Sequence, residues 1–433
     1  MNMPNTDRRT FLKSSAAATL TTSLFTGQVR GANDRIAAAF IGMGKMGRDN
    51  LRHALKQDNL VPVAVCDIFQ RNLDWAVEGS KGQAKPYHDF REILADKSID
   101  VVCISTPDHW HAYMMVEACK AGKDVYVEKP ICVTVDEGAK MVQAARKYKR
   151  VVQAGTMQRS ALHFQHACDI VRSGRLGEIA FVRTWNYGHS KPEGIGNPPD
   201  QEPPATLDWD MWLGPAPKRP FNPNRFGVDP EDKYFSTFRW FWDYAGGMMT
   251  DWGVHWLDIV QMAFNEAMPA AITAMGGKLW IKDNRETPDT LQVTYEYPGF
   301  IAVYENRSSN SQSMFEKGGG ILFHGTKATM FLDRTGFKIV PEKGSDIEPM
   351  EEKSESGGNV RHWANFLECV RTREKPISDI EVCQRSTTTC LLGNVALRSR
   401  LRLDWEPQRW TTAQPEAHKY LSREYRKPWK LVV

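Results

Sequence analysis

The feature that most constrains the fold is a glycine-rich loop between an apolar strand and a helix. Residues 36–41 form a short, continuous apolar run, and Gly42, Gly44 and Gly47 follow it in a G-x-G-x-x-G pattern at the start of an expected helix. Gly42 would permit a tight turn, Gly44 would leave room for a pyrophosphate, and Gly47 would let the helix pack closely on the strand. The folded part of the chain is therefore expected to begin with a βαβ unit whose helix N-terminus binds phosphate groups.

The same rhythm of apolar runs continues to about residue 155. Further strands are expected at 60–66, 99–105, 124–127 and 151–154. Asp89 is expected to cap one intervening helix, and Thr134 with Glu137 forms a capping box for another. Strands that are apolar throughout indicate a parallel sheet covered on both faces. We predict an α/β fold class, with a doubly wound Rossmann domain over residues 33–155.

The pattern changes after residue 155. Helices are expected at 162–173, 361–371 and 379–400, and alternating strands are expected at 178–187, 271–279, 290–297, 301–308 and 320–333. Alternation of polar and apolar residues is typical of antiparallel sheets with one solvated face. Residues 156–433 are thus predicted to form an α+β domain with a large, mostly antiparallel open sheet. Its irregular, Pro- and Trp-rich stretch at 187–241 is expected to shape a site or a subunit contact.

The first 32 residues differ from the rest. Arg8-Arg9 precedes Phe11-Leu12-Lys13 and a short run rich in Ala and Thr, an order typical of a twin-arginine export signal. We therefore expect the protein to be periplasmic or otherwise exported. The eight cysteines form no C-x-x-C pair and do not resemble a disulfide framework, which fits a protein that folds in a reducing compartment before export.

Charge and hydropathy exclude two classes of partner. The net charge is only +4 over 433 residues, and no long basic run occurs, so we expect no binding to nucleic acid. No stretch of about 18 apolar residues occurs, so we expect no membrane span.

An acidic residue at the end of the second strand specifies the expected dinucleotide. Asp67 lies about twenty residues after the glycine loop, where a carboxylate binds ribose hydroxyls and repels a 2′-phosphate. We therefore predict NAD as the cofactor, with NADP possible because Arg71 lies nearby. Met43 and Met46, within the loop, are also expected to contribute to cofactor binding.

A Glu-Lys-Pro sequence ends the strand at 124–127. Ligands of open α/β sheets bind beyond the carboxyl ends of the strands, so Glu128 and Lys129 are expected beside the cofactor. The Lys129 ammonium could stabilise an alkoxide, and Pro130 would fix the backbone that directs it. A surface lysine before a loop is the alternative in isolation.

Three segments together resemble the Gfo/Idh/MocA family, which includes glucose–fructose oxidoreductase and inositol dehydrogenase. They are the glycine loop, the Ser105–His111 segment and the Glu-Lys-Pro sequence, and the resemblance covers essentially all of the chain after the N-terminal signal. It implies that Lys129 serves cofactor and substrate binding, and that Thr106, Pro107 and His111 lie along the dinucleotide. It also implies that residues 156–433 serve as a substrate and oligomerisation domain, with a homodimer or homotetramer formed across the open sheet.

A second family-like signature contains Asp251 and His255. On one helix, residues four apart share a face. A histidine suits removal of a hydroxyl proton, and a neighbouring carboxylate can orient the ring or bind a second hydroxyl. A surface pair, or a metal site with Asp258 or His189 as third ligand, are the alternatives. The resemblance favours catalysis without a metal, since hydride transfer to a nicotinamide needs none.

Seven of the fourteen tryptophans lie between residues 185 and 256. Indole rings stack well on sugar rings, although most of these residues are expected in the core. Tyr187, His189 and Trp242 are the weaker candidates for substrate binding.

These observations lead to three hypotheses. The first is an NAD(P)-dependent oxidoreductase that oxidises or reduces a secondary hydroxyl of a sugar, sugar derivative or cyclitol. The second is a glycoside hydrolase or lyase that uses tightly bound, internally recycled NAD. The third is a non-catalytic sugar-binding protein, which the presence of both Lys129 and His255 disfavours.

Overall fold

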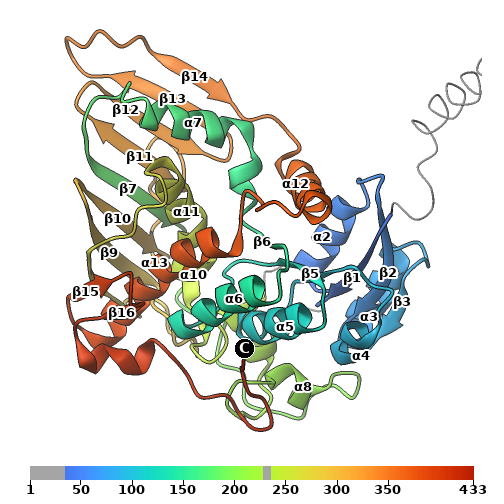
Figure 1. Ribbon diagram of the computed structural model, residues 1–433. Helices are drawn as coiled ribbons and strands as arrows, with labels where there is room; N and C mark the ends of the chain where they lie inside the picture. The colour runs from blue at the N-terminus through green and yellow to red at the C-terminus, as the bar shows by residue number, and fades with distance from the viewer. Residues whose placement is uncertain (1–34, 228–235) are drawn as a thin grey trace, which may run out of the picture.

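The computed structural model describes residues 35–227 and 236–433, so the expected export signal lies outside the described residues. The N-terminal domain is built on a six-stranded parallel sheet in the order β3-β2-β1-β4-β5-β6. Its strands are β1 (Ile36–Ile41), β2 (Leu60–Cys66), β3 (Lys85–Tyr87), β4 (Val101–Ile104), β5 (Asp124–Val127) and β6 (Val152–Ala154). This order, with helices on both faces (Figure 1), confirms the predicted Rossmann topology.

Most helices of this domain were expected from the sequence. They are α2 (Lys45–Ala54), α3 (Gln70–Gly79), α4 (Phe90–Ala95), α5 (Asp108–Lys120) and α6 (Val135–Lys147). The capping roles of Asp89 and of Thr134 with Glu137 are confirmed. Helix α3 and strand β3 were not predicted, because β3 has only three residues and none of them is buried.

The C-terminal domain contains a ten-stranded mixed sheet in the order β14-β13-β12-β11-β7-β10-β9-β8-β15-β16. Its strands are β7 (Ile179–Tyr187), β8 (Ala271–Gly277), β9 (Thr290–Tyr297), β10 (Phe300–Arg307), β11 (Gly319–Gly325), β12 (Ala328–Asp333), β13 (Gly336–Pro341), β14 (Met350–Lys353), β15 (Leu403–Glu406) and β16 (Thr411–Thr412). Strands β7 and β10 pair in parallel, and the other ladders are antiparallel.

One strand prediction in this sheet was wrong. The expected single strand at 320–333 is a hairpin of β11 and β12, because the chain turns at Thr326-Lys327 and the two strands then pair. The strands from β13 onward were not predicted, and those after β13 have only two to four residues each. The expected turn at Tyr297-Pro298-Gly299 does join β9 to β10, and Gly299 there has a φ of 92°.

A layer of helices joins the two domains. Short helix η2 (Met157–Ser160) leads from β6 to α7 (Leu162–Arg172), and α10 (Gly247–Asp251), α11 (Gly253–Ala263) and α13 (Ile380–Ser399) follow later in the chain. Figure 1 shows α10, α11 and α13 between the large sheet and the Rossmann domain. Helix α13 packs against β8 on one side and α6 on the other. Side chains from both domains therefore meet within this layer.

Two C-terminal segments return to the nucleotide domain. Helix α12 (Gly358–Thr372) packs on α2, and its Trp363 ring stacks on Tyr126 of β5 at a centroid distance of 4.5 Å. The chain end brings Trp429 to within 4.9 Å of the Trp110 ring on α5. These contacts fix the relative position of the two domains through aromatic packing.

The irregular stretch at 187–241 folds over the Rossmann sheet. It contains α8 (Trp209–Leu213), α9 (Pro223–Phe226) and η3 (Thr237–Trp240) around a small apolar cluster of its own. The carbonyl of Trp212 accepts hydrogen bonds from the His109 and Trp110 rings of α5. The stretch thereby lies beside the carboxyl ends of the strands, where Met211, Trp212 and Phe226 line a pocket together with strand-end residues.

All eight cysteines are buried and free, consistent with the absence of a disulfide framework in the sequence. Within residues 35–227 and 236–433, no helix combines the length and the apolar character needed to cross a lipid bilayer.

Candidate active site

The geometry of the glycine loop matches the role predicted for each glycine. Gly42 has a φ of +84°, and a Cβ there would lie 2.6 Å from the Thr106 amide nitrogen. A Cβ on Gly47 would lie 1.9 Å from the Gly42 carbonyl oxygen. A Cβ on Gly44 would meet nothing within 4 Å, so open space lies beside this residue at the start of α2. That space fits the pyrophosphate of a dinucleotide.

A pocket runs from the glycine loop to the domain junction. The predicted cofactor residues that line it are Gly42, Gly44, Met46, Asp67, Thr106, Pro107, His111, Glu128 and Lys129. Met43 and Gly47 do not line it, in contrast to the prediction. Met43 is fully buried in the core, and Gly47 is pressed against the loop backbone, so both support the pocket from behind.

Asp67 is held at the end of β2 by backbone amides. Its carboxylate accepts hydrogen bonds from the amides of Met43 at 2.6 Å and Phe69 at 2.9 Å. Burial raises the pKa of Asp67, and these hydrogen bonds oppose that rise. Arg71 stacks on the Trp75 ring at 4.6 Å and does not line the pocket. The acidic residue, rather than the arginine, therefore lines the pocket at the expected ribose position.

The Thr106–His111 segment forms the opposite wall. The Thr106 hydroxyl is buried and has no hydrogen-bond partner in the described part of the chain. The His111 ring bridges two backbone carbonyls, with Nδ1 2.7 Å from the Pro130 oxygen and Nε2 2.8 Å from the Thr106 oxygen. The unpartnered hydroxyl on the pocket wall fits a polar group of a bound dinucleotide.

The Glu128 carboxylate braces the end of β5. It accepts a hydrogen bond from Asn50 of α2 at 2.9 Å and another from the Lys129 amide at 3.2 Å. Burial raises the pKa of Glu128. Asn50 also donates to the Ser105 hydroxyl at 3.1 Å. This network ties β5 to β4 and α2, and so fixes the backbone from which Lys129 extends.

Lys129 crosses the domain junction and contacts Asp251. Its ammonium lies 2.9 Å from the Asp251 carboxylate and 3.0 Å from the Asp251 carbonyl oxygen. Arg239 of η3 contacts the other carboxylate oxygen at 3.2 Å. Burial opposes ionisation of Asp251, but Arg239 and Lys129 outweigh it and lower its pKa to about 2. Asp251 is therefore an anion clamped between two cations.

Asp108 is a further carboxyl group near this cluster. It lines the same pocket, and burial raises its pKa to about 7 against the opposing influence of Lys129 and Arg239. The sequence pattern predicted Asp108 only as the start of a helix. Its position directly after Thr106 and Pro107, two predicted cofactor-binding residues, could have identified it as a pocket residue.

His255 lies buried just beyond Asp251, with 5% of its surface exposed. Burial, together with the charges of Lys129 and Arg334, lowers its pKa well below 6.5. Its Nδ1 atom has no hydrogen-bond partner among the described residues. Burial therefore favours the neutral form of the imidazole, and the side chain does not line the pocket itself.

The predicted single helix through Asp251 and His255 is wrong in detail. Helix α10 ends at Asp251, and α11 begins at Gly253, because the chain tightens at Trp252. There the His255 amide donates to the Trp252 carbonyl three residues back, at 3.0 Å. The two side chains nevertheless share a neighbourhood, since Lys129 and Arg334 influence the pKa of both.

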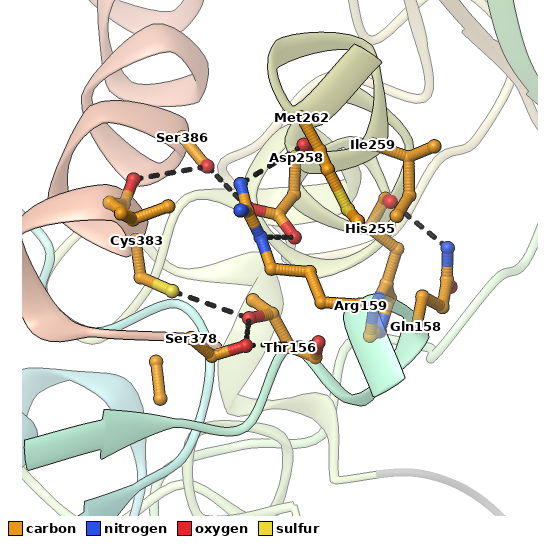
Figure 2. Close-up of polar contacts among 12 residues, drawn as sticks. Thr156, Gln158, Arg159, His255, Asp258, Ile259, Met262, Ser378, Cys383 and Ser386 are labelled. Atoms are coloured by element: carbon orange, nitrogen blue, oxygen red, sulfur yellow. Dashed lines mark hydrogen bonds and ion pairs between the residues drawn. The ribbon is translucent and has the colours of Figure 1, made fainter. Parts of the chain in front are cut away.

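A buried ion pair anchors α11 (Figure 2). Arg159 of η2 donates to both carboxylate oxygens of Asp258 at 2.8 Å, and the two side chains are 3% and 1% exposed. Ser386 of α13 also donates to Asp258. The neighbouring Gln158 amide donates to the His255 carbonyl at 3.1 Å. The loop that leaves the Rossmann sheet therefore fixes the helix that carries His255.

The alternative of a metal site does not fit this arrangement. Asp258 is engaged by Arg159 and Ser386, and Asp251 lies between two cations. Cations beside a carboxylate disfavour a metal ion there. Within the described ranges, no group of three His, Cys, Asp or Glu side chains is placed to hold a metal.

A second cavity, of about 1220 Å³, adjoins this cluster on the side of the large sheet. Tyr187 and His189 line it, so both candidate substrate residues lie beside the site. Trp242 does not line it, in contrast to the prediction, because its ring packs 4.8 Å from the Arg398 guanidinium. Trp240 and Trp252 line the cavity instead.

Comparisons with known proteins agree with this geometry. Residues 36–156 match the family model described as "Oxidoreductase family, NAD-binding Rossmann fold", and residues 175–431 match "Oxidoreductase family, C-terminal alpha/beta domain". The solved structure of levoglucosan dehydrogenase, in complex with NADH and levoglucosan, is similar in fold. Its TM-score is 0.66 at 14% identity, over 86% of this chain and 99% of that one.

Two curated relatives match less than half of this chain. Inositol 2-dehydrogenase of Salmonella typhimurium is 33% identical over 157 residues, which are 36% of this chain and 47% of the relative. A glycosyl hydrolase family 109 protein of Shewanella baltica is 29% identical over 210 residues, which cover 41% of this chain and 45% of the relative. The chain thus spans about half the length of the curated relatives it matches. With family models matched in both domains, the chain belongs to the Gfo/Idh/MocA oxidoreductase family and carries its NAD-binding Rossmann domain.

Proposed function

We propose that this protein catalyses the reversible, NAD-dependent oxidation of a secondary hydroxyl group in a sugar, sugar derivative or cyclitol. One observation carries the proposal. The Lys129 ammonium, on the wall of the NAD pocket, lies 2.9 Å from Asp251, and its charge helps to lower the pKa of the buried His255. A cation and a neutral base at one site are what oxidation of an alcohol requires.

Each residue then has a defined role. NAD, when bound, supplies the hydride acceptor. His255 accepts the proton of the substrate hydroxyl, and Lys129 stabilises the oxygen as negative charge develops on it. Asp251, held ionised by its two cationic neighbours, keeps the ammonium in place. Of the curated relatives, inositol 2-dehydrogenase, named for oxidation of a cyclitol, supports this assignment of reaction class.

The test is a panel of sugars and cyclitols with the full chain. NADH absorbance and product mass are recorded in the same reactions. Net NADH formation with a product two mass units below the substrate is the expected result. Failure of every sugar and cyclitol to reduce NAD would contradict the proposal.

A glycoside hydrolase that keeps and recycles its NAD is a second candidate. The similarity to the family 109 glycosyl hydrolase proteins favours it. The same panel, extended with aryl glycosides, separates the two candidates. Release of the aglycone without net NADH formation would favour the hydrolase, and NADH without aglycone favours the dehydrogenase.

We also propose export through the twin-arginine route. A reporter fused behind residues 1–32 is expected to reach the periplasm, and replacing Arg8 and Arg9 by Lys is expected to retain it in the cytoplasm.

We further propose a homodimer or homotetramer. Apolar side chains exposed on or beside β8, namely Met275, Leu279 and Trp280, support self-association. Light scattering after size-exclusion chromatography measures the oligomeric mass, and a monomer would contradict this proposal.

A further inference from the structure

The second cavity begins where the NAD pocket ends. Short helix η3 separates the two, since Arg239 lines the NAD pocket while Thr237 and Trp240 line the second cavity. The two cavities also meet between α10 and α11, where Asp251 lines the NAD pocket and the following residue, Trp252, lines the second cavity. A substrate in the second cavity would therefore have its reacting hydroxyl at the Lys129–Asp251 pair.

The walls of this cavity are cationic. Five basic residues and one carboxylate line it: Lys191, Arg285, Arg307, Lys317, Arg334 and Asp333. Asp283 neutralises Arg285 at 2.9 Å, and Asp333 lies 3.8 Å from Lys317. Among the residues that the structure describes, Lys191, Arg307 and Arg334 have no carboxylate within 4.0 Å. Counted over the described residues that line it, the cavity thus carries more cationic than anionic side chains.

Two of these guanidinium groups are held in place by aromatic rings. Arg307 lies 3.6 Å from the Tyr187 ring centroid, and Arg334 lies 4.4 Å from that of Trp252. The Arg334 Nε atom donates to Gln158 at 3.0 Å, which leaves its two terminal nitrogens for another acceptor. Stacking fixes the plane of each guanidinium group. Arg307 also donates through Nε and Nη2 to the backbone carbonyls of Asn310 and Gln312, which leaves its Nη1 for an anion, whereas Arg334 offers both terminal nitrogens.

Arg334 links the cavity to the reacting centre. It influences the pKa of both Asp251 and His255, and it stacks on Trp252 between them in sequence. The aromatic walls formed by Trp240 and Trp252 offer flat apolar surfaces suited to the C–H face of a sugar ring. The cavity therefore combines a surface for a ring with fixed donors for an anion.

We propose that the substrate is an anionic carbohydrate, in which a sugar ring carries a carboxylate, sulfate or phosphate group bound by Arg334 and Arg307. This inference rests on the proposed function, because it assigns the substrate class of that same site. The volume of about 1220 Å³ leaves room for a substituent beyond one ring.

The test compares matched neutral and anionic sugars by calorimetry on the full chain saturated with NADH. The pairs are glucose with glucuronate, galactose with galacturonate, and glucose with its 6-sulfate and 6-phosphate. At least one anion is expected to bind tenfold or more tightly than its neutral partner. The preference should shrink in 0.5 M salt, and the three kinds of anion identify the group that is recognised.

Two variants and one control attribute the preference to the cavity. Arg307→Gln is expected to reduce the ratio of the two dissociation constants at least fivefold, and Arg307→Lys is expected to restore part of it. Lys343→Gln removes an exposed lysine outside this cavity and is expected to keep the ratio. Equal affinities within each pair, or no binding of any sugar, would overturn the inference.

Turnover of the same sugars, assayed in separate samples that contain NAD in place of NADH, separates this inference from the proposed function. NADH formation from neutral sugars without any anion preference would overturn the substrate class and leave the redox function standing. Anion preference without NADH formation from any sugar would support the substrate class and contradict the redox function.

Discussion

The buried ion pair between Arg159 and Asp258 gives the sharpest prediction about stability. Arg159→Met would leave Asp258, which is 1% exposed, with Ser386 as its remaining side-chain partner. Removing one partner of a buried pair leaves an uncompensated charge and costs about 3–5 kcal/mol. Glu266, the other partner of Arg159, is 26% exposed. Because water can solvate its carboxylate, the loss of the Arg159–Glu266 contact adds little to this cost.

The assay is guanidinium chloride denaturation followed by tryptophan fluorescence, with m-values compared between variants. Arg159→Met is expected to lower the free energy of unfolding by about 3–5 kcal/mol. The double variant Arg159→Met with Asp258→Leu is expected to recover much of that loss, because the orphaned charge is gone.

The control is Arg409→Met, which breaks an ion pair whose side chains are 75% and 36% exposed. Exposed pairs contribute about 0–1 kcal/mol. A loss for Arg159→Met no larger than that of Arg409→Met would refute the claim that this pair anchors the helix carrying His255.

Three further predictions concern the NAD pocket and the catalytic residues. Gly44→Ala is expected to weaken NADH binding at least tenfold with little change in the thermal midpoint of the free protein, because its Cβ fills open space. Gly47→Ala should lower that midpoint markedly, because its Cβ would meet the loop backbone. Equal effects of the two variants on NADH binding and on the midpoint would contradict this reading. His255→Asn is expected to lower kcat by roughly 10²–10⁴-fold in steady-state assays while NADH titration stays within twofold, and kcat close to wild type would remove His255 from the mechanism. Since the folded-state pKa of Asp108 is raised from 3.8 to about 7, the unfolded chain loses its proton first, and stability falls between pH 4 and pH 7. The stability of Asp108→Asn should therefore rise relative to that of the wild type across that window, by up to about 4 kcal/mol. The same difference in unfolding free energy between variant and wild type at pH 5 and at pH 8 would be inconsistent with the raised pKa.

The nucleotide domain could be predicted from sequence because its determinants are local. The glycine loop, the acid at Asp67 and the caps at Asp89 and Thr134 each act within one or two turns of the chain. Strand β3 was missed because three residues, none of them buried, carry no hydrophobic pattern.

The domain junction could be predicted only in part. Lys129 and Asp251 were identified separately, and their contact depends on packing between segments 122 residues apart. Arg239 and Arg334 belong to the site through tertiary contacts with Asp251 and Trp252, for which no local pattern exists. Trp242 was chosen by its type, yet packing against Arg398 takes it out of the cavity.

The central claim is that a hydride passes from a sugar carbon to NAD beside Lys129 and His255. The most direct measurement mixes the protein, NAD and ring-deuterated sugars, and follows deuterium into NADH by mass spectrometry. The claim predicts deuterated NADH with the wild-type chain, and its loss in Lys129→Met and His255→Asn variants whose NADH binding is measured in parallel. Absence of deuterium from NADH with every sugar, or unchanged transfer in both variants, would contradict it.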